Sequence, residues 1–173
     1  WYFEALLDNI GTDYSGSFPY VGVMAYESYT GSQYVGTTGG AGYNPAGYIY
    51  SNNGDGTNTG TTYTSADVIG CALDLDNSKI YWSKNGTYVS NGSGTGNPST
   101  GANGYDIANI RNGDMGFAVS GYKINAEWAC NFGNPYYSIS SSNSDANDFG
   151  NFEYAVPSGY LSLNTKNLSE ELS

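Results

Sequence analysis

The chain of 173 residues contains no histidine. Histidine is the side chain that most often serves as a general base near neutral pH, and it is the commonest protein ligand of transition metals. Its absence removes the Ser-His-Asp and Cys-His arrangements of nucleophilic enzymes. Two cysteines without histidine cannot form an ordinary zinc site. Paired carboxylates, as in glycoside hydrolases, are the one remaining plausible source of catalysis.

Basic residues are scarce as well. Five Lys and Arg residues face sixteen Asp and Glu residues, which gives a formal net charge of −11. The basic residues are scattered along the chain: Lys79, Lys84, Arg111, Lys123 and Lys166. Because such a chain repels phosphate backbones, we expect no nucleic-acid partner. No apolar stretch approaches about 18 residues, so we expect no membrane insertion.

The cysteine content is low, and the two cysteines lie far apart in the chain. Cys71 and Cys130 each belong to an apolar run typical of a strand. Each can serve as a small buried hydrophobic residue, or the two can form one disulfide. We favour buried thiols, and the sequence alone leaves both states open.

Glycine and tyrosine are abundant, with 25 and 18 residues, whereas good helix formers are few. No window of about ten residues has apolar positions at helical spacing. Gly, Asn, Ser and Asp recur about every eight to twelve residues, which is typical of short strands joined by turns. The length suits one domain with its own core. We therefore predict an all-β, antiparallel β-sandwich.

The strands are expected where apolar residues alternate with polar ones. In the opening run Trp1, Phe3, Ala5 and Leu7 share one face, and Glu4 and Asp8 lie on the opposite face. Further strands are predicted at 20–26, 48–50, 67–75, 79–84, 115–119 and 127–132, with a last short strand at 160–163. The segments 27–45, 51–62, 88–113 and 138–151 are expected to be loops, and the end of the chain is expected to fray.

Residues 67–86 are the most informative stretch. They predict two strands joined by a tight Asp76-Asn77-Ser78 turn, and an Asn85-Gly86 turn ends the second strand. Ile69, Cys71, Leu73 and Leu75 face one way, and Ile80 and Trp82 continue this buried face on the return strand.

Several motifs occur in the order found in one known family: Trp1-Tyr2-Phe3-Glu4, Val21-Gly22-Val23, the 67–86 stretch, Gly116-Phe117-Ala118-Val119-Ser120 and Asn131-Phe132-Gly133. Over about residues 1–135 the chain therefore resembles the SPRY domain. The resemblance implies a sandwich of concanavalin-like jelly-roll topology that recognises partners through loops at one end. The chain departs from the family at Ser65-Ala66, where a Gly usually precedes the Asp. It also lacks the strands that usually precede the Trp-Tyr-Phe-Glu motif, so we expect a fragment of a longer protein. Its open edge would be free, or covered by the C-terminal segment or another chain.

The C-terminal part, residues 136–173, is expected to be an extension of loops and a short strand that packs on the sandwich. The runs 149–154 and 157–168 resemble the tail that follows SPRY domains in predicted bacteriophage proteins, especially those of marine phages. This resemblance implies a location in the virion, an extracellular particle assembled in the host cytoplasm.

The loops supply the candidate binding residues. Tyrosine offers contact area at low entropic cost, and small polar residues adapt to a partner, as in antibody paratopes. The candidates are the loop tyrosines Tyr29, Tyr34, Tyr43, Tyr88, Tyr105 and Tyr122. The alternative is that these rings only cover the ends of the sandwich.

The acidic residues fit structural roles better than catalytic ones. Asp74 and Asp76 could form a carboxylate pair near Asp67, but short carboxylates in such places usually accept backbone N–H groups in turns. The oxygen-rich loop 52–58 lacks the spacing of an EF-hand and is better explained as a plain turn. We therefore expect no catalytic residues, no metal and no cofactor.

Together these features predict a non-enzymatic binding or structural module of a phage virion protein. It would be a tail-fibre, adhesin or decoration element, oligomeric within the particle. Its partners would be neighbouring virion subunits or a protein or glycan of the host surface. The alternatives are a carbohydrate-active enzyme that uses an acidic pair, and an intracellular SPRY domain that binds proteins.

Overall fold

The computed structural model describes residues 1–12, 18–31, 33–121 and 124–171 of the chain. Sheet 1 has the strand order β11-β1-β6-β7-β8, and β9 also pairs with β7. Its strands are β1 (Tyr2–Asn9), β6 (Val68–Asp74), β7 (Lys79–Lys84), β8 (Thr87–Tyr88), β9 (Tyr105–Asp106) and β11 (Glu127–Asn131). Sheet 2 has the order β10-β2-β3-β4-β5. It contains β2 (Tyr20–Ala25), β3 (Gly40–Tyr43), β4 (Tyr48–Ser51), β5 (Thr57–Asn58) and β10 (Met115–Ser120).

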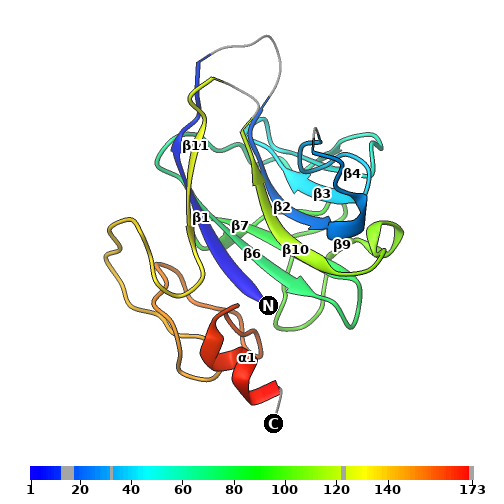
Figure 1. Cartoon of the computed structure of the whole chain (residues 1–173). Helices are drawn as coiled ribbons and strands as arrows, with labels where there is room; N and C mark the ends of the chain where they lie inside the picture. The colour runs from blue at the N-terminus through cyan, green and yellow to red at the C-terminus, as the bar shows by residue number, and fades with distance from the viewer. Residues whose placement is uncertain (13–17, 32, 122–123, 172–173) are drawn as a thin grey trace.

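All the strand pairs are antiparallel, and the two sheets face each other around one core (Figure 1). The all-β sandwich prediction is thus confirmed. Among the residues that the structure describes, helix is confined to two short 3₁₀ turns, η1 (Tyr26–Ser28) and η2 (Ala108–Ile110), and to α1 (Thr165–Glu171) near the C-terminus. No helix in the described part of the chain is long and apolar enough to cross a membrane.

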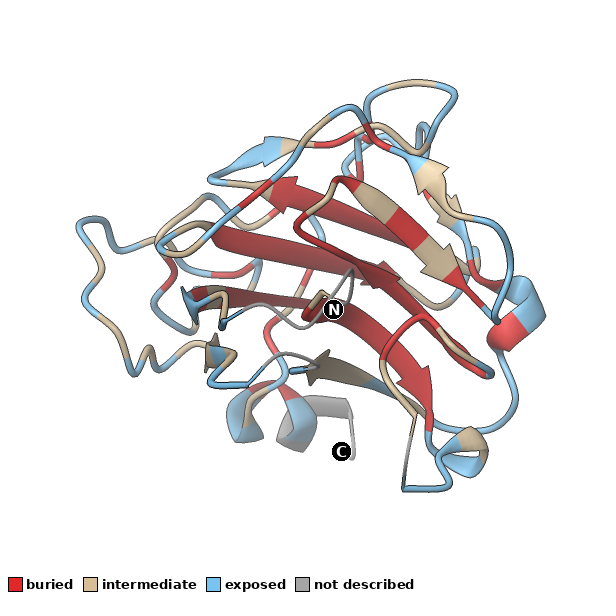
Figure 2. Ribbon diagram, turned by 90° about the horizontal axis from the view of Figure 1, so that it is seen from above, coloured by how far each residue is buried: buried red, intermediate tan, exposed pale blue. Residues whose placement is uncertain are grey.

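The core is built by the alternation that the sequence shows. Phe3, Ala5 and Leu7 of β1 point between the sheets and are almost inaccessible to solvent. Trp82 of β7 crosses the core, where its indole Nε1 donates a hydrogen bond to the Val21 carbonyl of sheet 2 at 3.0 Å. Figure 2 shows the buried residues concentrated on the central strands and the exposed ones on the connections. The Trp82 side chain therefore fills the space between the two sheets, and its hydrogen bond joins them.

The expectation that 27–45 is one long loop is wrong, because β3 occupies its last part. The Gly40-Ala41-Gly42 run is typical of a turn, but here the small residues let other parts of the chain approach closely. A Cβ built on Gly42 would lie 2.8 Å from a Val35 methyl group, and one built on Gly22 would lie 2.1 Å from the Ala41 carbonyl oxygen. The glycines are required by packing against neighbouring backbone, which local sequence does not reveal.

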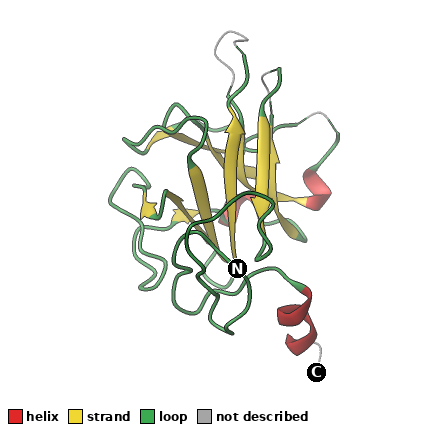
Figure 3. Ribbon diagram, turned by 90° about the vertical axis from the view of Figure 1, so that its left-hand side faces the viewer, coloured by secondary structure: helices red, strands yellow, loops and turns green. Residues whose placement is uncertain are grey.

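The C-terminal segment 136–171 covers the outer face of sheet 1. Phe152 and Tyr160 pack there with Tyr2, Ala72 and Tyr81 in a second buried cluster. Figure 3 shows this segment as a series of loops beside the strands, ending in α1. The predicted strand at 160–163 is reduced to a single bridge between Tyr2 and Ser162, and α1 was not expected at all. The expected loop 138–151 is held in place by a bridge between Asn143 and Phe152.

Two buried carboxylates anchor this segment. Glu4 of β1 is fully buried and accepts hydrogen bonds from the backbone N–H groups of Glu153 at 3.0 Å and Tyr154 at 2.8 Å. Asp145 accepts bonds from the Ser162 backbone N–H at 2.9 Å and from the Asn167 amide at 2.7 Å. The face of β1 that carries Glu4, polar by its sequence pattern, is therefore an interface within the molecule.

The environments of these two carboxyl groups shift their pKa values in opposite directions. Burial raises the pKa of Glu4, and the hydrogen bonds from Tyr154 and Glu153 only partly oppose it. Burial would also raise the pKa of Asp145, but hydrogen bonds from Ser162, Phe149 and Asn167 outweigh it and hold the pKa below its usual range.

The two cysteines flank β1 on its neighbours β6 and β11, and both are free thiols. Cys71 is fully buried, and Cys130 is partly buried against the core. Burial raises the pKa of both thiols. The prediction of buried thiols therefore agrees with the structure for Cys71 fully and for Cys130 in part.

β1 does not form the edge of its sheet, although it opens the chain. It lies between β6 and β11, and the edges of sheet 1 are β11 and β8. The sequence left the edge beside β1 either free or covered by the C-terminal segment or another chain. In the structure β11 and β6 pair with both sides of β1.

Candidate functional site

The outer face of sheet 2 carries a cavity of about 470 Å³, here called the outer groove, which residues 24–26, 29, 33, 35 and 116–120 line. Its floor follows from the alternation of β10. Met115, Phe117 and Val119 pack against the core, so Gly116 and Ala118 face outward. A Cβ built on Gly116 would meet no atom within 4 Å, which shows that the space above it is open.

The wall of the outer groove is the segment that follows β2. Tyr26 of η1 and Tyr29 are exposed to 79% and 56%, which is unusual for aromatic rings beside an apolar floor. Val35, at the other end of the segment, is buried, and its backbone N–H donates to the Ser120 hydroxyl at 3.3 Å. The Tyr26 N–H donates to the Asp114 carbonyl at 2.8 Å. Hydrogen bonds at both ends therefore hold the wall against β10.

The described residues that line the groove are uncharged, and the charges beside them are negative. Glu27 stands between the two exposed tyrosines in the sequence, and Asp114 immediately precedes β10. Both carboxylates are exposed, and neither forms a salt bridge with a residue that the structure describes. The arrangement suits a ligand that combines apolar surface with positive charge.

Of the five predicted binding tyrosines that the structure describes, Tyr29 is the one that lines the outer groove. Tyr34 is half-buried with its ring 5.1 Å from that of Tyr20, and Tyr122 lies outside the described residues. The role of Tyr29 and Tyr34 in binding stays a prediction.

The other three tyrosines belong to strands instead of loops. Tyr43 of β3 is fully buried, and its hydroxyl donates to the Thr61 carbonyl at 2.5 Å, so it is not available to a partner. The sequence suggested otherwise because its glycine-rich approach resembles a loop. Tyr88 of β8 is half-buried beside the second cluster, and Tyr105 of β9 packs edge-to-face with Trp82 at 6.1 Å. These rings complete the packing of the sandwich.

Sequence reasoning missed Tyr26, Gln33 and the small residues of β10. Tyr26 was assigned to the end of a strand, whereas it begins a 3₁₀ turn. The signal that was present is the alternation of small residues, Gly116 and Ala118, with large apolar ones along a single strand. It predicts a strand with a bare outer face.

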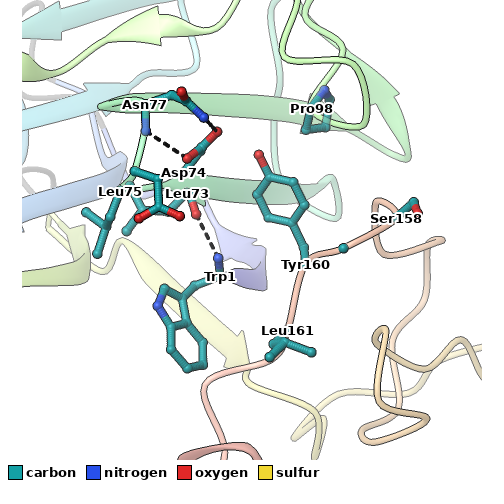
Figure 4. Close-up of a pocket in the computed structure, with 11 residues that line it drawn as sticks. Trp1, Leu73, Asp74, Leu75, Asn77, Pro98, Ser158, Tyr160 and Leu161 are labelled. Atoms are coloured by element: carbon teal, nitrogen blue, oxygen red, sulfur yellow. Dashed lines mark hydrogen bonds between the residues drawn. The ribbon is translucent and has the colours of Figure 1, made fainter. Parts of the chain in front are cut away.

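A second cavity of about 470 Å³ lies where the β6–β7 turn meets the C-terminal segment (Figure 4). Its lining includes Asp74, Asp76 and Asn77 from the turn, Tyr160 from the C-terminal segment, and Trp1. The Asp74 carboxylate accepts hydrogen bonds from the Asn77 backbone N–H at 3.0 Å and from its side-chain amide at 2.8 Å. Asp74 therefore stabilises the turn.

Asp67 has a comparable role at the opposite end of β6. It accepts hydrogen bonds from the Thr64 N–H at 2.8 Å and the Asn85 amide at 2.7 Å, and it lies 3.1 Å from the Lys84 ammonium. Burial alone would raise the pKa of Asp67, but these three contacts outweigh it and hold the pKa below its ordinary value. Asp67 and Asp74 are separated by the length of the strand, about 20 Å. They cannot act on one substrate bond.

The oxygen-rich loop after β4 is a turn. Asn52 and Asn53 adopt left-handed backbone conformations, with φ of 52° and 59°, and the Gly54 N–H donates to the Ser51 carbonyl at 2.8 Å. Within the ranges that the structure describes, no group of three or more His, Cys, Asp or Glu residues could hold a metal ion.

The comparisons with known proteins agree with this architecture. The model of the SPRY domain matches residues 1–95. The solved SPRY domain of human HERC1 is 20% identical, with 74% of this chain and 70% of that chain covered and a TM-score of 0.52. A second human SPRY domain is 21% identical, with 75% and 74% covered and the same TM-score of 0.52. At these identities the two structures establish the fold. No curated protein matches the chain.

Proposed function

Because the chain belongs to the SPRY family, whose domains are typically protein-interaction modules, we propose that it binds a protein partner in the outer groove and catalyses no reaction. The observation that carries this proposal is the pair of exposed rings, Tyr26 and Tyr29, beside an open apolar floor. Monomeric proteins seldom expose contiguous apolar surface without a binding role. Tyrosine is among the residues most enriched at interface hot spots.

The charge of the molecule limits the partner. With a net charge of −11 and the exposed carboxylates Glu27 and Asp114 at the groove, basic partners are attracted and acidic ones repelled. The proposed partner surface is therefore apolar at its centre and basic at its margin.

The test uses a library of random peptides displayed on yeast and selected against the whole chain. Peptides rich in apolar and basic residues are expected. Affinity should fall by about 30-fold or more in a Tyr26→Ala, Tyr29→Ala double variant, as for hot-spot residues. Tyr136→Ala is the matched control, because Tyr136 is 93% exposed and lies outside the groove. Equal binding by all variants would contradict the proposed site, and selective binding to a glycan array instead would contradict the proposed partner class.

We further propose that the protein is a component of a bacteriophage particle, either a host-recognition element or a subunit that holds its neighbours. The support is the resemblance of residues 149–154 and 157–168 to the tail of predicted phage proteins. Immunogold labelling of purified particles with an antibody to this domain tests the location. Label on the particle is expected. Label confined to free protein in the infected cytosol would favour the intracellular alternative and would leave the protein-binding proposal intact.

The enzyme alternative has less support, since Asp74 is engaged by Asn77 and Asp67 stands at the other end of β6. Polysaccharide turnover by the purified chain, abolished in Asp74→Asn, would reverse this order.

A further inference from the structure

The free edge of sheet 2 at β10 lacks the features that protect exposed strands. Natural proteins protect sheet edges with short strands, charges, prolines or bulges. The edge strands β5 and β8 have two residues each, and β11 begins with Glu127 and shifts its register with β1. β10 has six residues, none charged and none proline, in continuous register with β2. It pairs with no other strand among the described residues.

The register shows which backbone groups of β10 face the open edge. The Tyr26 N–H donates to the Asp114 carbonyl, so these two residues form a hydrogen-bonded pair. Antiparallel pairs alternate between hydrogen-bonded and non-hydrogen-bonded positions, so Gly116 and Ala118 also bond to β2. The residues whose N–H and C=O groups point away from β2 are therefore Met115, Phe117 and Val119.

We propose that the partner binds as an extended strand of about six residues, about 20 Å long, added to sheet 2 along β10. This proposal rests on the proposed function and specifies how the same site holds its ligand. Backbone hydrogen bonds to β10 supply affinity that does not depend on the partner's sequence. Side chains of the added strand supply the specificity.

The two faces of the added strand meet different surroundings. Its inward side chains lie beside Phe117, whose ring is 6.3 Å from that of Phe132 at the half-buried flank of the sandwich. These positions require apolar residues. Its outward side chains lie beside Gly116 and Ala118, where the groove has room for large residues that reach Tyr29.

Charge complementarity predicts which end of the partner strand is basic. Glu27 and Asp114 stand at the Met115 end of β10, are exposed, and have no salt-bridge partner in the described part of the chain. A Lys or Arg at the corresponding end of the partner strand would pair with them. The inferred ligand is thus a segment of alternating apolar residues with a basic residue at one end.

Amide hydrogen exchange measured by NMR tests the alternation directly, with a peptide from the selection above as the probe. In the free chain the Gly116 and Ala118 amides are expected to exchange slowly and those of Phe117 and Val119 quickly. A saturating peptide should slow the Phe117 and Val119 amides by about tenfold or more, because strand addition gives them acceptors. Unchanged exchange at these two amides, with a peptide that still needs Tyr26 and Tyr29, would overturn strand addition and leave the proposed function standing.

A proline variant gives an independent readout. Val119→Pro changes the side chain and removes one backbone donor, an N–H that faces the open edge, a place where edge strands tolerate proline. It should weaken the peptide about tenfold or more, whereas Val119→Ala, which shortens the same side chain and keeps the N–H, should stay within about threefold. If Val119→Pro does not fold, N-methylation of alternate backbone amides of the peptide removes the donors on the partner strand instead. Methylation of the amides that face β10 should weaken binding, and methylation of the amides that face away should not. Concentration-dependent protection of Phe117 and Val119 without peptide would identify a second copy of the chain as the occupant and overturn the proposed partner.

Discussion

Replacement of Glu4 by alanine should destabilise the whole domain, although the side chain lies on the face of β1 turned away from the main core. Glu4 is inaccessible to solvent and accepts hydrogen bonds from five groups. The distances from the Glu4 carboxylate oxygens to the donors are 3.2 Å to Tyr2 Oη, 3.3 Å to Asn131 Nδ2, 3.2 Å to Tyr137 Oη, 3.0 Å to Glu153 N and 2.8 Å to Tyr154 N. These donors connect β1, β11 and the C-terminal segment through one carboxylate.

The magnitude follows from the donors that the variant leaves without an acceptor. Each buried donor that loses its partner costs about 1–3 kcal/mol. The Asn131 amide keeps a second acceptor, the Asn151 carbonyl at 2.8 Å. The backbone N–H groups of Glu153 and Tyr154 have no other acceptor in the part of the chain that the structure describes. The free energy of unfolding should therefore fall by about 3–5 kcal/mol in Glu4→Ala. In Glu4→Gln one acceptor oxygen remains, so the loss should be smaller.

Urea unfolding followed by tryptophan fluorescence measures this change, and the melting temperature should fall by about 6–20 °C. Glu127→Ala on the neighbouring strand β11 is the matched control, because Glu127 is exposed and its replacement should change stability by less than about 0.5 kcal/mol. Limited proteolysis should cut the C-terminal segment first in Glu4→Ala. A free energy of unfolding of Glu4→Ala within about 1 kcal/mol of that of the control would refute this explanation.

Three further predictions concern acid, thiols and close packing. The pKa of Asp145 is lower in the folded chain than the ordinary 3.8, so the stability that its carboxylate contributes is complete above pH 3.8 and is lost as the pH falls through the folded pKa. The free energy of unfolding should therefore decline less steeply below pH 3.8 in Asp145→Asn than in the unmodified chain. Equal declines in acid would contradict this. Cys71 should resist Ellman's reagent in the native chain and Cys130 should react slowly, since burial raises the pKa of both thiols, and both should react at once in urea. Gly22→Ala should destabilise the chain by about 1–3 kcal/mol in urea unfolding, because its Cβ would lie 2.1 Å from the Ala41 carbonyl oxygen; an unchanged midpoint would show that sheet 2 can yield there.

The local pattern of the chain determined its strands and its fold class. Apolar residues at every second position placed Phe3, Ala5 and Leu7 in the core. The turn residues between Asp74 and Lys79 predicted the β6–β7 hairpin. Both features depend on neighbours in the sequence, since a strand's two faces and a tight turn are set within a few residues. The motif order that resembles the SPRY domain extended this to the family.

The tertiary structure alone decided which polar and aromatic residues are available at the surface. Glu4 is buried because a segment 149 residues later in the chain lies on it, and Tyr43 is buried because its ring packs in the core against Tyr63 and Trp82. Tyr29 remains exposed beside the edge strand β10, whose only strand partner in the described part of the chain is β2. These outcomes depend on contacts between residues distant in sequence, and no local period records such contacts. For that reason the sequence predicted a sandwich, and only the fold showed which of its tyrosines are exposed and which are buried.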